Sequence, residues 1–503
     1  MSALLRIFAH DRIAPIDPRL YGSFVEHLGR CVYTGIYEPG HPAADAAGWR
    51  TDVLDLVRPL QVPIVRYPGG NFVSAYDWED GVGPRAERPR RLDFAWASTE
   101  TNQVGTNEFM DWCKLAGTTP MMAVNLGTRG LDAARALLEY CNHPRDSKYA
   151  DLRRKHGYAD PHNVRVWCLG NEMDGPWQTG HKTALEYGRL AAETARAFRQ
   201  YDPTLELVAC GSSGPNMNTF PEWDREVLEH TYDSVDAISL HLYLGRYEHS
   251  LADYLASAVT LDNQIKAIIS TCDYVQARGR HKKPMALSFD EWNVWDMKKG
   301  PMHPPGMVRW SEAQPQVEQI YTFADALLFA GLMLGLIRHA QRVRMACLAQ
   351  LVNVIAPIMT RPGGAAWRQP TYWIYMHGSL HGRGELVETR LSGAPMTEAK
   401  SHGASPDLDA VVTRNGDQLT VFALNRGADA HPLELRLDGA TRWKMIAHAL
   451  LAATDLEATN SPEAPATVAP RELPLAPISA DGRLELRLPA YSWHCIRLIA
   501  TAG

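Results

Sequence analysis

Two glutamates, Glu172 and Glu291, stand in sequence contexts that suit acid–base chemistry. Glu172 follows Asn171 in WCLGNEMDGPWQTG, and Glu291 precedes Trp292 in SFDEWNVW. Two opposed carboxyl groups are the minimum for cleaving a glycosidic bond, because one protonates the leaving oxygen while the other, ionised, attacks or activates water. A single acid at a strand end is more often an exposed residue than a catalytic one. Two acids at the same level of their strand ends are much less often merely exposed residues. The two glutamates are therefore our first catalytic candidates.

The elements that would position these residues alternate along the chain. From about residue 15 to 375, short apolar segments alternate with longer stretches of helical periodicity. Most of the apolar segments are nearly continuous, which is typical of parallel strands covered on both faces. Eight such strands separated by helices predict an α/β fold, a (β/α)8 TIM barrel. A doubly wound open sheet is the alternative, but no GxGxxG or GxxxxGK[ST] sequence follows any strand. The candidate strands are 22–26, 64–67, 121–125, 164–169, 207–210, 237–241, 285–289 and 345–351.

The carboxyl ends of barrel strands form the active site in this fold. Glu172 and Glu291 are 119 residues apart. At about 40 residues per unit of an enlarged barrel, they would stand on strands 4 and 7, across the mouth from each other. Six or more strand ends carry polar side chains, more than a purely structural barrel needs. These residues are Glu26, His27, Arg66, Asn71, Asn125, Asn171, Glu172, His241, Tyr243, Asp290, Glu291, Gln350 and Asn353.

The chain beyond residue 375 has a different pattern, with alternating apolar and polar residues. Asn415-Gly416 between two such segments is a strong hairpin signal. We expect residues 376–503 to form a C-terminal antiparallel, jelly-roll-like β-sandwich, joined by an N-terminal strand within residues 1–14, and residues 15–375 to form the catalytic barrel. The Pro- and Ala-rich stretch 453–477 predicts a long surface excursion.

Composition excludes several classes of function. The formal net charge of −6, with 45% hydrophobic and 21% charged residues, is ordinary for a globular protein and argues against nucleic acid or a membrane as the main partner. The longest nearly apolar run, 326–337, suits a buried helix and is too short to span a bilayer. Eight scattered cysteines without a CxxC pair predict buried reduced thiols. With no secretory signal visible, we expect a cytoplasmic protein.

The sequence shows no sign of a metal or cofactor. HExxH, cysteine clusters, EF-hand loops and GxSxG are all missing, so we expect no metal and no cofactor. Several tryptophans lie near the candidate motifs, and flat aromatic faces pack against sugar rings. We expect Trp292 to lie in the core or behind the site and Trp295 to be exposed in the cleft. Two roles stay open for Arg66, a functional one in the site and a structural ion pair beneath it.

Six stretches in order resemble the α-L-arabinofuranosidases of glycoside hydrolase family 51: GSFVEHLGRCVYTGIYEPGHP, VRYPGGNFVSAYDWEDGVGP, WCLGNEMDGPWQTG, SLHLYLG, SFDEWNVW and AQLVNVIAPI. This resemblance implies that Glu172 is the general acid/base and Glu291 the nucleophile. It also implies that the arabinosyl ring of the −1 subsite is bounded by several other residues. They are Glu26, Arg66, Asn71, Asn171, Tyr243 and Gln350 around the ring, with Trp96 and Trp295 as walls.

The resemblance implies a retaining, exo-acting enzyme that releases terminal α-L-arabinofuranosyl residues from arabinoxylan, arabinan or derived oligosaccharides. It also implies an intracellular homo-oligomer, often a hexamer. The linkage preference (1,2, 1,3 or 1,5) stays open. Two other hypotheses are that the same barrel cleaves β-xylosides or internal β-glucan linkages, or that it only binds carbohydrate through a degenerate site. The presence of both glutamates argues against the second.

Overall fold

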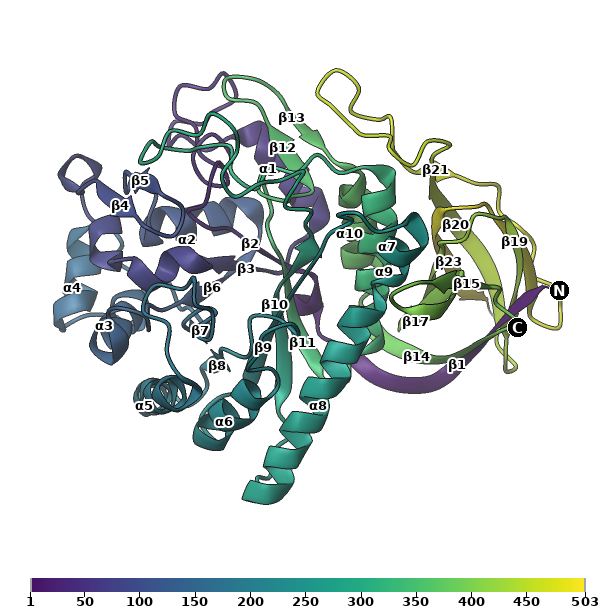
Figure 1. Ribbon diagram of the computed structural model, residues 1–503, viewed down its shortest axis with the longest axis horizontal. Coiled ribbons are helices and arrows are strands. Elements are labelled where there is room, and N and C mark those ends of the chain that lie inside the picture. Colours follow the sequence, from purple (N-terminus) through teal and green to yellow (C-terminus); the bar gives the residue numbers. More distant parts are fainter. Residues whose placement is uncertain (1, 502–503) are drawn as a thin grey trace.

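A closed eight-stranded parallel barrel is the centre of the computed structural model, which describes residues 2–501 (Figure 1). The strands follow one another around the barrel in chain order, and every neighbouring pair is parallel. The predicted (β/α)8 barrel is therefore confirmed. Its strands are β2 (Gly22–Phe24), β3 (Ile64–Tyr67), β6 (Thr119–Ala123), β7 (Val166–Leu169), β8 (Glu206–Ala209), β9 (Ala237–Leu244), β10 (Ala286–Val294) and β11 (Val343–Leu348).

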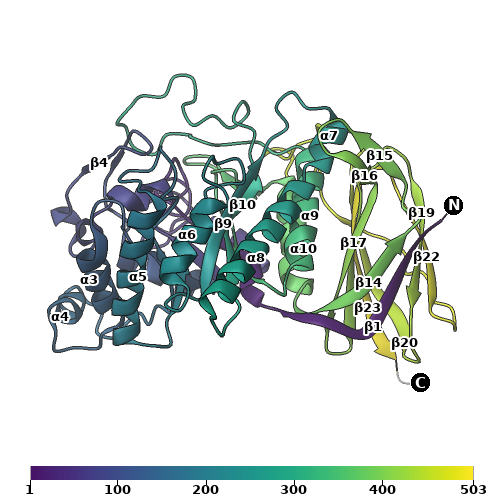
Figure 2. The same cartoon turned by 60° about the horizontal axis from the view of Figure 1, so that its bottom comes forward.

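Helices surround the barrel on its outside (Figure 2). α9 is buried along nearly its whole length because it lies between the barrel and the C-terminal sheet, and it contains the apolar run 326–337. No helix within residues 2–501 combines the length and apolar character needed to cross a membrane. The helices are α1 (Thr51–Val57), α2 (Thr106–Ala116), α3 (Gly130–Asn142), α4 (Lys148–Lys155), α5 (Ala184–Tyr201), α6 (Glu222–Thr231), α7 (Leu251–Ala256), α8 (Val259–Gly279), α9 (Phe323–Arg338) and α10 (Pro370–His381).

Two strands extend further toward the mouth than the sequence predicts. β10 runs to Val294 instead of ending at residue 289, and β9 runs to Leu244. The apolar pattern ends at Asp290, but Asp290 and Glu291 are buried inside the barrel and paired with other side chains, so polarity does not end the strand. A register shift between Ser288 and Glu291 accompanies this change. Glu291 therefore projects from a rigid strand and not from a loop.

The C-terminal part is a nine-stranded sheet beside the barrel, at the right in Figure 1. It is antiparallel except where β1 pairs in parallel with β19, so the expectation of a wholly antiparallel sandwich needs that correction. Strands from both ends of the sheet enclose one apolar core, so the sheet folds over on itself. The strands are β1 (Ala3–Ile16), β14 (Gly384–Ser392), β17 (Leu408–Asn415), β18 (Gln418–Asn425), β19 (His431–Leu437), β20 (Arg442–Ala452), β21 (Arg471–Glu472), β22 (Arg483–Leu488) and β23 (Ser492–Thr501).

Three two-stranded sheets complete the described chain. The hairpin of β4 and β5 stands over the barrel mouth and is part of the site described below. The predicted turn at Asn415-Gly416 does join β17 to β18, and Gly416 has a φ of +62°. All eight cysteines are buried free thiols. The small sheets are β4 (Arg91–Asp93) with β5 (Ser98–Glu100), β12 (Ile358–Thr360) with β13 (Ala366–Arg368), and β15 (Met396–Ala399) with β16 (Gly403–Pro406).

The barrel and the folded sheet share apolar surface. Phe422, Leu424 and Trp493 from the sheet belong to the same buried cluster as the barrel helices. The excursion 453–477 lies against the barrel, because the backbone carbonyls of Leu456 and Ala458 accept hydrogen bonds from the first residues of α9. The division into domains 15–375 and 376–503 stays a prediction.

Candidate active site

The two candidate glutamates face each other at the carboxyl ends of the barrel strands. Glu172 follows β7, the fourth strand, with a φ of +42°, and Glu291 lies in β10, the seventh. Both are buried, and one carboxylate oxygen of each lies within 4.8 Å of the other. The predicted positions at strands 4 and 7 are therefore correct, and the barrel brings the two carboxyl groups together.

Arg66 and Tyr243 hold the carboxylate of Glu291 from two sides. The Arg66 guanidinium donates to Glu291 Oε1 at 2.7 Å, and the Tyr243 hydroxyl donates to Oε2 at 2.8 Å. A second arm of Arg66 donates to Asn171 Oδ1 at 2.7 Å. Burial alone would lower the pKa of Arg66, but Asp290 and Glu291 raise it well above its usual value, so the guanidinium stays charged. Arg66 thus forms a buried ion pair with Glu291, and its contact with the substrate stays a prediction.

Glu172 has different partners on its two oxygens. Oε1 lies 2.9 Å from His241 Nδ1, and Oε2 accepts a hydrogen bond of 2.7 Å from the indole N–H of Trp177. Burial is the largest influence on the pKa of Glu172 and raises it; the charge of Glu291 adds to this, while the contacts with His241 and Trp177 oppose it. The net direction is upward, as a group that must hold a proton requires.

Glu26 is the centre of a third cluster, at the end of β2. Its Oε1 accepts from the backbone N–H of Phe72 and the indole N–H of Trp96, both at 3.0 Å, and its Oε2 accepts from Gln350 at 3.1 Å. Burial and the nearby charge of Glu291 raise the pKa of Glu26 to about 8. Gly70 is required beside it, because a Cβ there would come 2.2 Å from Glu26 Oε2. Glu26, Trp96 and Gln350 thus form one hydrogen-bonded group at the end of β2.

The remaining predicted residues lie at the same end of the barrel. Asn171 donates to Asn71 Oδ1 at 3.4 Å, which joins the ends of β7 and β3. Trp295 was expected to be exposed in the cleft, but it is only partly exposed. Its indole N–H donates to the carbonyl of Gly300 at 2.7 Å, and its ring packs edge-on against Tyr243 at 5.5 Å. These two contacts turn the ring inward. Trp292 is buried, as predicted.

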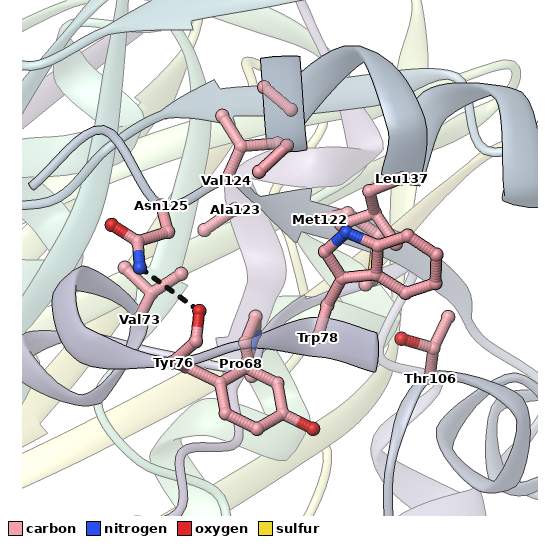
Figure 3. A pocket seen from close by; sticks show the side chains of 12 residues that line it. Pro68, Val73, Tyr76, Trp78, Thr106, Met122, Ala123, Val124, Asn125 and Leu137 are labelled. Carbon is pink, nitrogen blue, oxygen red and sulfur yellow. Dashed lines mark hydrogen bonds between the residues drawn. The ribbon is translucent and has the colours of Figure 1, made fainter. Parts of the chain in front are cut away.

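A small cavity of about 10 Å³ is separate from this site, because Glu26, Glu172 and Glu291 do not line it (Figure 3). Its lining is almost entirely apolar, and Asn125 turns its amide away to donate to the carbonyl of Tyr76 at 3.0 Å. The volume is at most that of one water molecule, far below that of a sugar ring. Asn125, a strand-end residue of the sequence analysis, therefore holds a loop in place.

Within residues 2–501, one group of side chains has the spacing of metal ligands: Glu172, His241 and Glu291. Glu291 is already paired with the guanidinium of Arg66 and the hydroxyl of Tyr243, and the oxygens of Glu172 face the indole N–H of Trp177 and the ring of His241. A cation at this point would have to displace these partners. We therefore assign no metal to the three residues.

Three residues at the site were given no catalytic or binding role from the sequence. Trp177 donates to Glu172, and His241 stands between Glu172 and Asp290. His241 and Asp290 were named only as polar residues at strand ends. Trp177 lies five residues after Glu172 in a loop, and only the folded loop shows that its indole returns to the carboxylate.

Comparison with known proteins agrees with this geometry. Two family models match, "Alpha-L-arabinofuranosidase 1 domain" over residues 56–250 and "Alpha-L-arabinofuranosidase C-terminal domain" over residues 290–492. The chain is similar to an intracellular exo-α-(1→5)-L-arabinofuranosidase from Bacillus subtilis, with 52% identity covering 97% of both chains. It also resembles the solved structure of a family 51 α-L-arabinofuranosidase from Bifidobacterium longum, with 43% identity, a TM-score of 0.93, and coverage of 98% of this chain and 99% of that one.

The chain belongs to glycoside hydrolase family 51. The resemblance inferred from six motifs is thereby confirmed, and so is the prediction of an enzyme: the protein is an exo-acting α-L-arabinofuranosidase. A further relative of this family, from Bifidobacterium longum, is 45% identical over 97% of this chain and 95% of its own, and is named an exo-α-(1→6)-L-arabinofuranosidase. The predicted cytoplasmic location agrees with the word "intracellular" in the name of the Bacillus subtilis relative.

Proposed function

We propose that this family 51 enzyme hydrolyses terminal α-L-arabinofuranosides by double displacement with retention of configuration. The observation that carries the proposal is the approach of Glu172 and Glu291 oxygens to within 4.8 Å. Retaining glycosidases hold their two carboxyl groups about 5–5.5 Å apart, whereas inverting ones leave about 6.5–9.5 Å for a water molecule. The short separation favours direct attack by one carboxylate on the sugar.

Glu291 is the nucleophile in this mechanism. The guanidinium of Arg66 and the hydroxyl of Tyr243 hold it as an oriented carboxylate. Its oxygen attacks the anomeric carbon and forms a covalent arabinosyl ester with inverted configuration, while the glycosidic bond breaks. In this mechanism Asn171, whose side-chain oxygen accepts from Arg66, hydrogen-bonds the 2-hydroxyl of the sugar.

Glu172 is the general acid and then the general base. Its raised pKa lets it carry the proton that the departing oxygen needs. After ester formation, ionised Glu172 takes a proton from water, and the resulting hydroxide attacks the anomeric carbon. This second inversion breaks the ester bond, frees the carboxylate of Glu291 and releases arabinose as the α-anomer; Glu172, now protonated, is ready for the next cycle.

The arabinosyl ring would be bounded by the residues that the resemblance assigned to the −1 subsite: Glu26, Arg66, Asn71, Asn171, Tyr243 and Gln350, with Trp96 and Trp295 as walls. For the substrate we propose arabinan-derived oligosaccharides with α-(1→5) linkages, supported by the name of the 52%-identical relative. The α-(1→6) name of the 45%-identical relative makes linkage the point to measure. Arabinoxylan fragments are the alternative substrate. Assembly as a homo-oligomer stays a prediction.

Two measurements test the proposal. Proton NMR during early turnover of 4-nitrophenyl α-L-arabinofuranoside should show α-arabinofuranose as the first product; early β-anomer would contradict retention. Separately, α-(1→5)-arabinotriose should be cleaved from one end to arabinose and arabinobiose, faster than arabinoxylan oligosaccharides. Carboxymethylcellulose and 4-nitrophenyl β-xyloside serve as controls for the β-glucan and β-xyloside alternatives and should remain intact.

A further inference from the structure

The imidazole of His241 stands between two carboxylates in the barrel interior. Nδ1 lies 2.9 Å from Glu172 Oε1, and Nε2 lies 2.9 Å from Asp290 Oδ1. Nδ1 is also 3.5 Å from Glu291 Oε2. The side chain of His241 is 3% exposed, and Gln264 of α8 donates to its backbone carbonyl at 3.0 Å, which fixes this part of β9. The ring is therefore held in one place with a carboxylate at each nitrogen.

Negative groups outnumber positive ones around this ring. Burial alone would lower the pKa of His241, but Glu291, Asp290 and Glu172 together raise it well above its usual value. Arg66 is the cation close to the same carboxylates. Titratable and charged groups from β3, β7, β8, β9, β10 and their loops face His241 or its partners. They are Arg66, Cys168, Glu172, Asp174, Cys210, Tyr243, Asp290 and Glu291.

We propose that His241 is a positioning residue that donates from both ring nitrogens, to Asp290 and to Glu172 Oε1, and so places the catalytic proton of Glu172 on Oε2. This inference rests on the acid/base role proposed for Glu172. Each oxygen of Glu172 faces an N–H group, and a protonated carboxyl oxygen can accept one such bond and still donate its own hydrogen. The charged N–H of His241 bonds more strongly to an unprotonated oxygen than the neutral indole does, so the proton is favoured on Oε2.

The position of Trp177 shows which way Oε2 faces. Trp177 is 49% exposed, whereas His241 is buried. Oε2 is thus on the side of Glu172 that opens toward solvent, where a leaving group must depart. In the second step Glu172 is ionised, and the same two donors, His241 and Trp177, hold both oxygens of the carboxylate. The same positions of His241 and Trp177 therefore suit both the protonated and the ionised form of Glu172.

The test replaces His241 by Gln, which removes the positive charge beside Glu172 and leaves Asp290 with only Arg66, 3.7 Å away, as a neighbouring cation. Both changes favour protonated Glu172. The basic limb of the kcat/KM profile for benzyl α-L-arabinofuranoside, an unactivated substrate that needs the acid, should move up by about 1–3 pH units. In the same variant, kcat for 4-nitrophenyl α-L-arabinofuranoside at neutral pH should fall, because less Glu172 is ionised to act as base.

A second variant and a matched control make the test independent of folding. Trp177→Phe keeps an aromatic ring at a half-exposed position but removes the indole N–H, so its basic limb should move in the same direction by a smaller amount. His448→Gln makes the same substitution at a buried histidine of the folded sheet, where the partner is His494, and its profile should match the parent.

The pH profiles of the variants show whether the proposal holds. A basic limb that stays in place in both site variants, or that moves to lower pH, overturns the proposal. A general loss of rate in His241→Gln without any movement of the limb would make His241 a packing residue only. Failure of the underlying function shows elsewhere: if Glu172 is not the acid, Glu172→Ala would retain the basic limb of the parent enzyme.

Discussion

Replacing each glutamate by alanine separates their roles by kinetics. In Glu172→Ala the contacts of Arg66 and Tyr243 with Glu291 remain, because neither residue contacts Glu172. The nucleophile is therefore still oriented, and only proton transfer is lost, a factor of roughly 10²–10⁴, or about 3–5 kcal/mol. In Glu291→Ala the ester cannot form, so turnover of every substrate should fall by several orders of magnitude.

The assay follows nitrophenol release and the configuration of an azide adduct. An activated aryl leaving group needs little protonation, so Glu172→Ala should form the ester rapidly and hydrolyse it slowly, which gives a burst. Azide needs no base and should rescue this variant; it attacks the ester with a second inversion and gives the α-arabinosyl azide. In Glu291→Ala azide can only displace the aryl group directly, so a single inversion gives the β-azide.

The reasoning would be refuted by the opposite pattern. A burst and an α-azide from Glu291→Ala, with neither from Glu172→Ala, would reverse the two roles. The burst and the azide anomer report independently, because one measures the lifetime of the ester and the other the number of inversions.

Three further predictions concern metals, the C-terminal part and pH. Activity should be unchanged after dialysis against EDTA, since the acidic groups of the site are already paired; loss that added metal restores would contradict this. Deletion from about residue 380 should give insoluble protein, measured by fractionation, because Phe422, Leu424 and Trp493 cover barrel surface and β1 would lose β14 and β19. Burial lowers the pKa of His448 to about 4 and of His494 to about 3, so the unfolding free energy should fall as pH falls below about 6.5, where the unfolded chain takes up protons. His494→Gln should flatten that dependence in urea titrations at pH 7 and 4.5, and an unchanged slope would exclude the pair as its source.

The barrel could be predicted from the sequence because each of its strands has a recognisable local pattern. Each is a short apolar run between amphipathic helices, and β3 was placed to the residue. The predicted strand ends are wrong where charged residues are buried. β10 was ended at residue 289 because Asp290 and Glu291 are charged, yet both are buried and continue the strand. Periodicity does not show that an interior acid is balanced by an arginine 225 residues away in the chain.

The site was predictable in its residue types but not in its contacts. Opposed glutamates at strands 4 and 7 follow from spacing and barrel geometry. The indole of Trp177 reaching back to Glu172 depends on the conformation of one loop, and Trp295 is turned inward by Gly300, a residue with no signal of its own. Such contacts between a loop and a strand are determined by tertiary packing, so the sequence alone left them undetermined.

The division of labour between the two glutamates follows from the charge of their donors. A permanent cation, Arg66, contacts Glu291, so the negative charge of the resting site is held there. Burial raises the pKa of nearby Glu172, and the charge of Glu291 raises it further. When Glu291 becomes an ester, its charge disappears while His241 and Trp177 remain on Glu172. The pKa of Glu172 must then fall, which converts the acid of the first step into the base of the second. The separation of less than 4.8 Å thus couples the chemistry of one carboxyl group to the ionisation of the other.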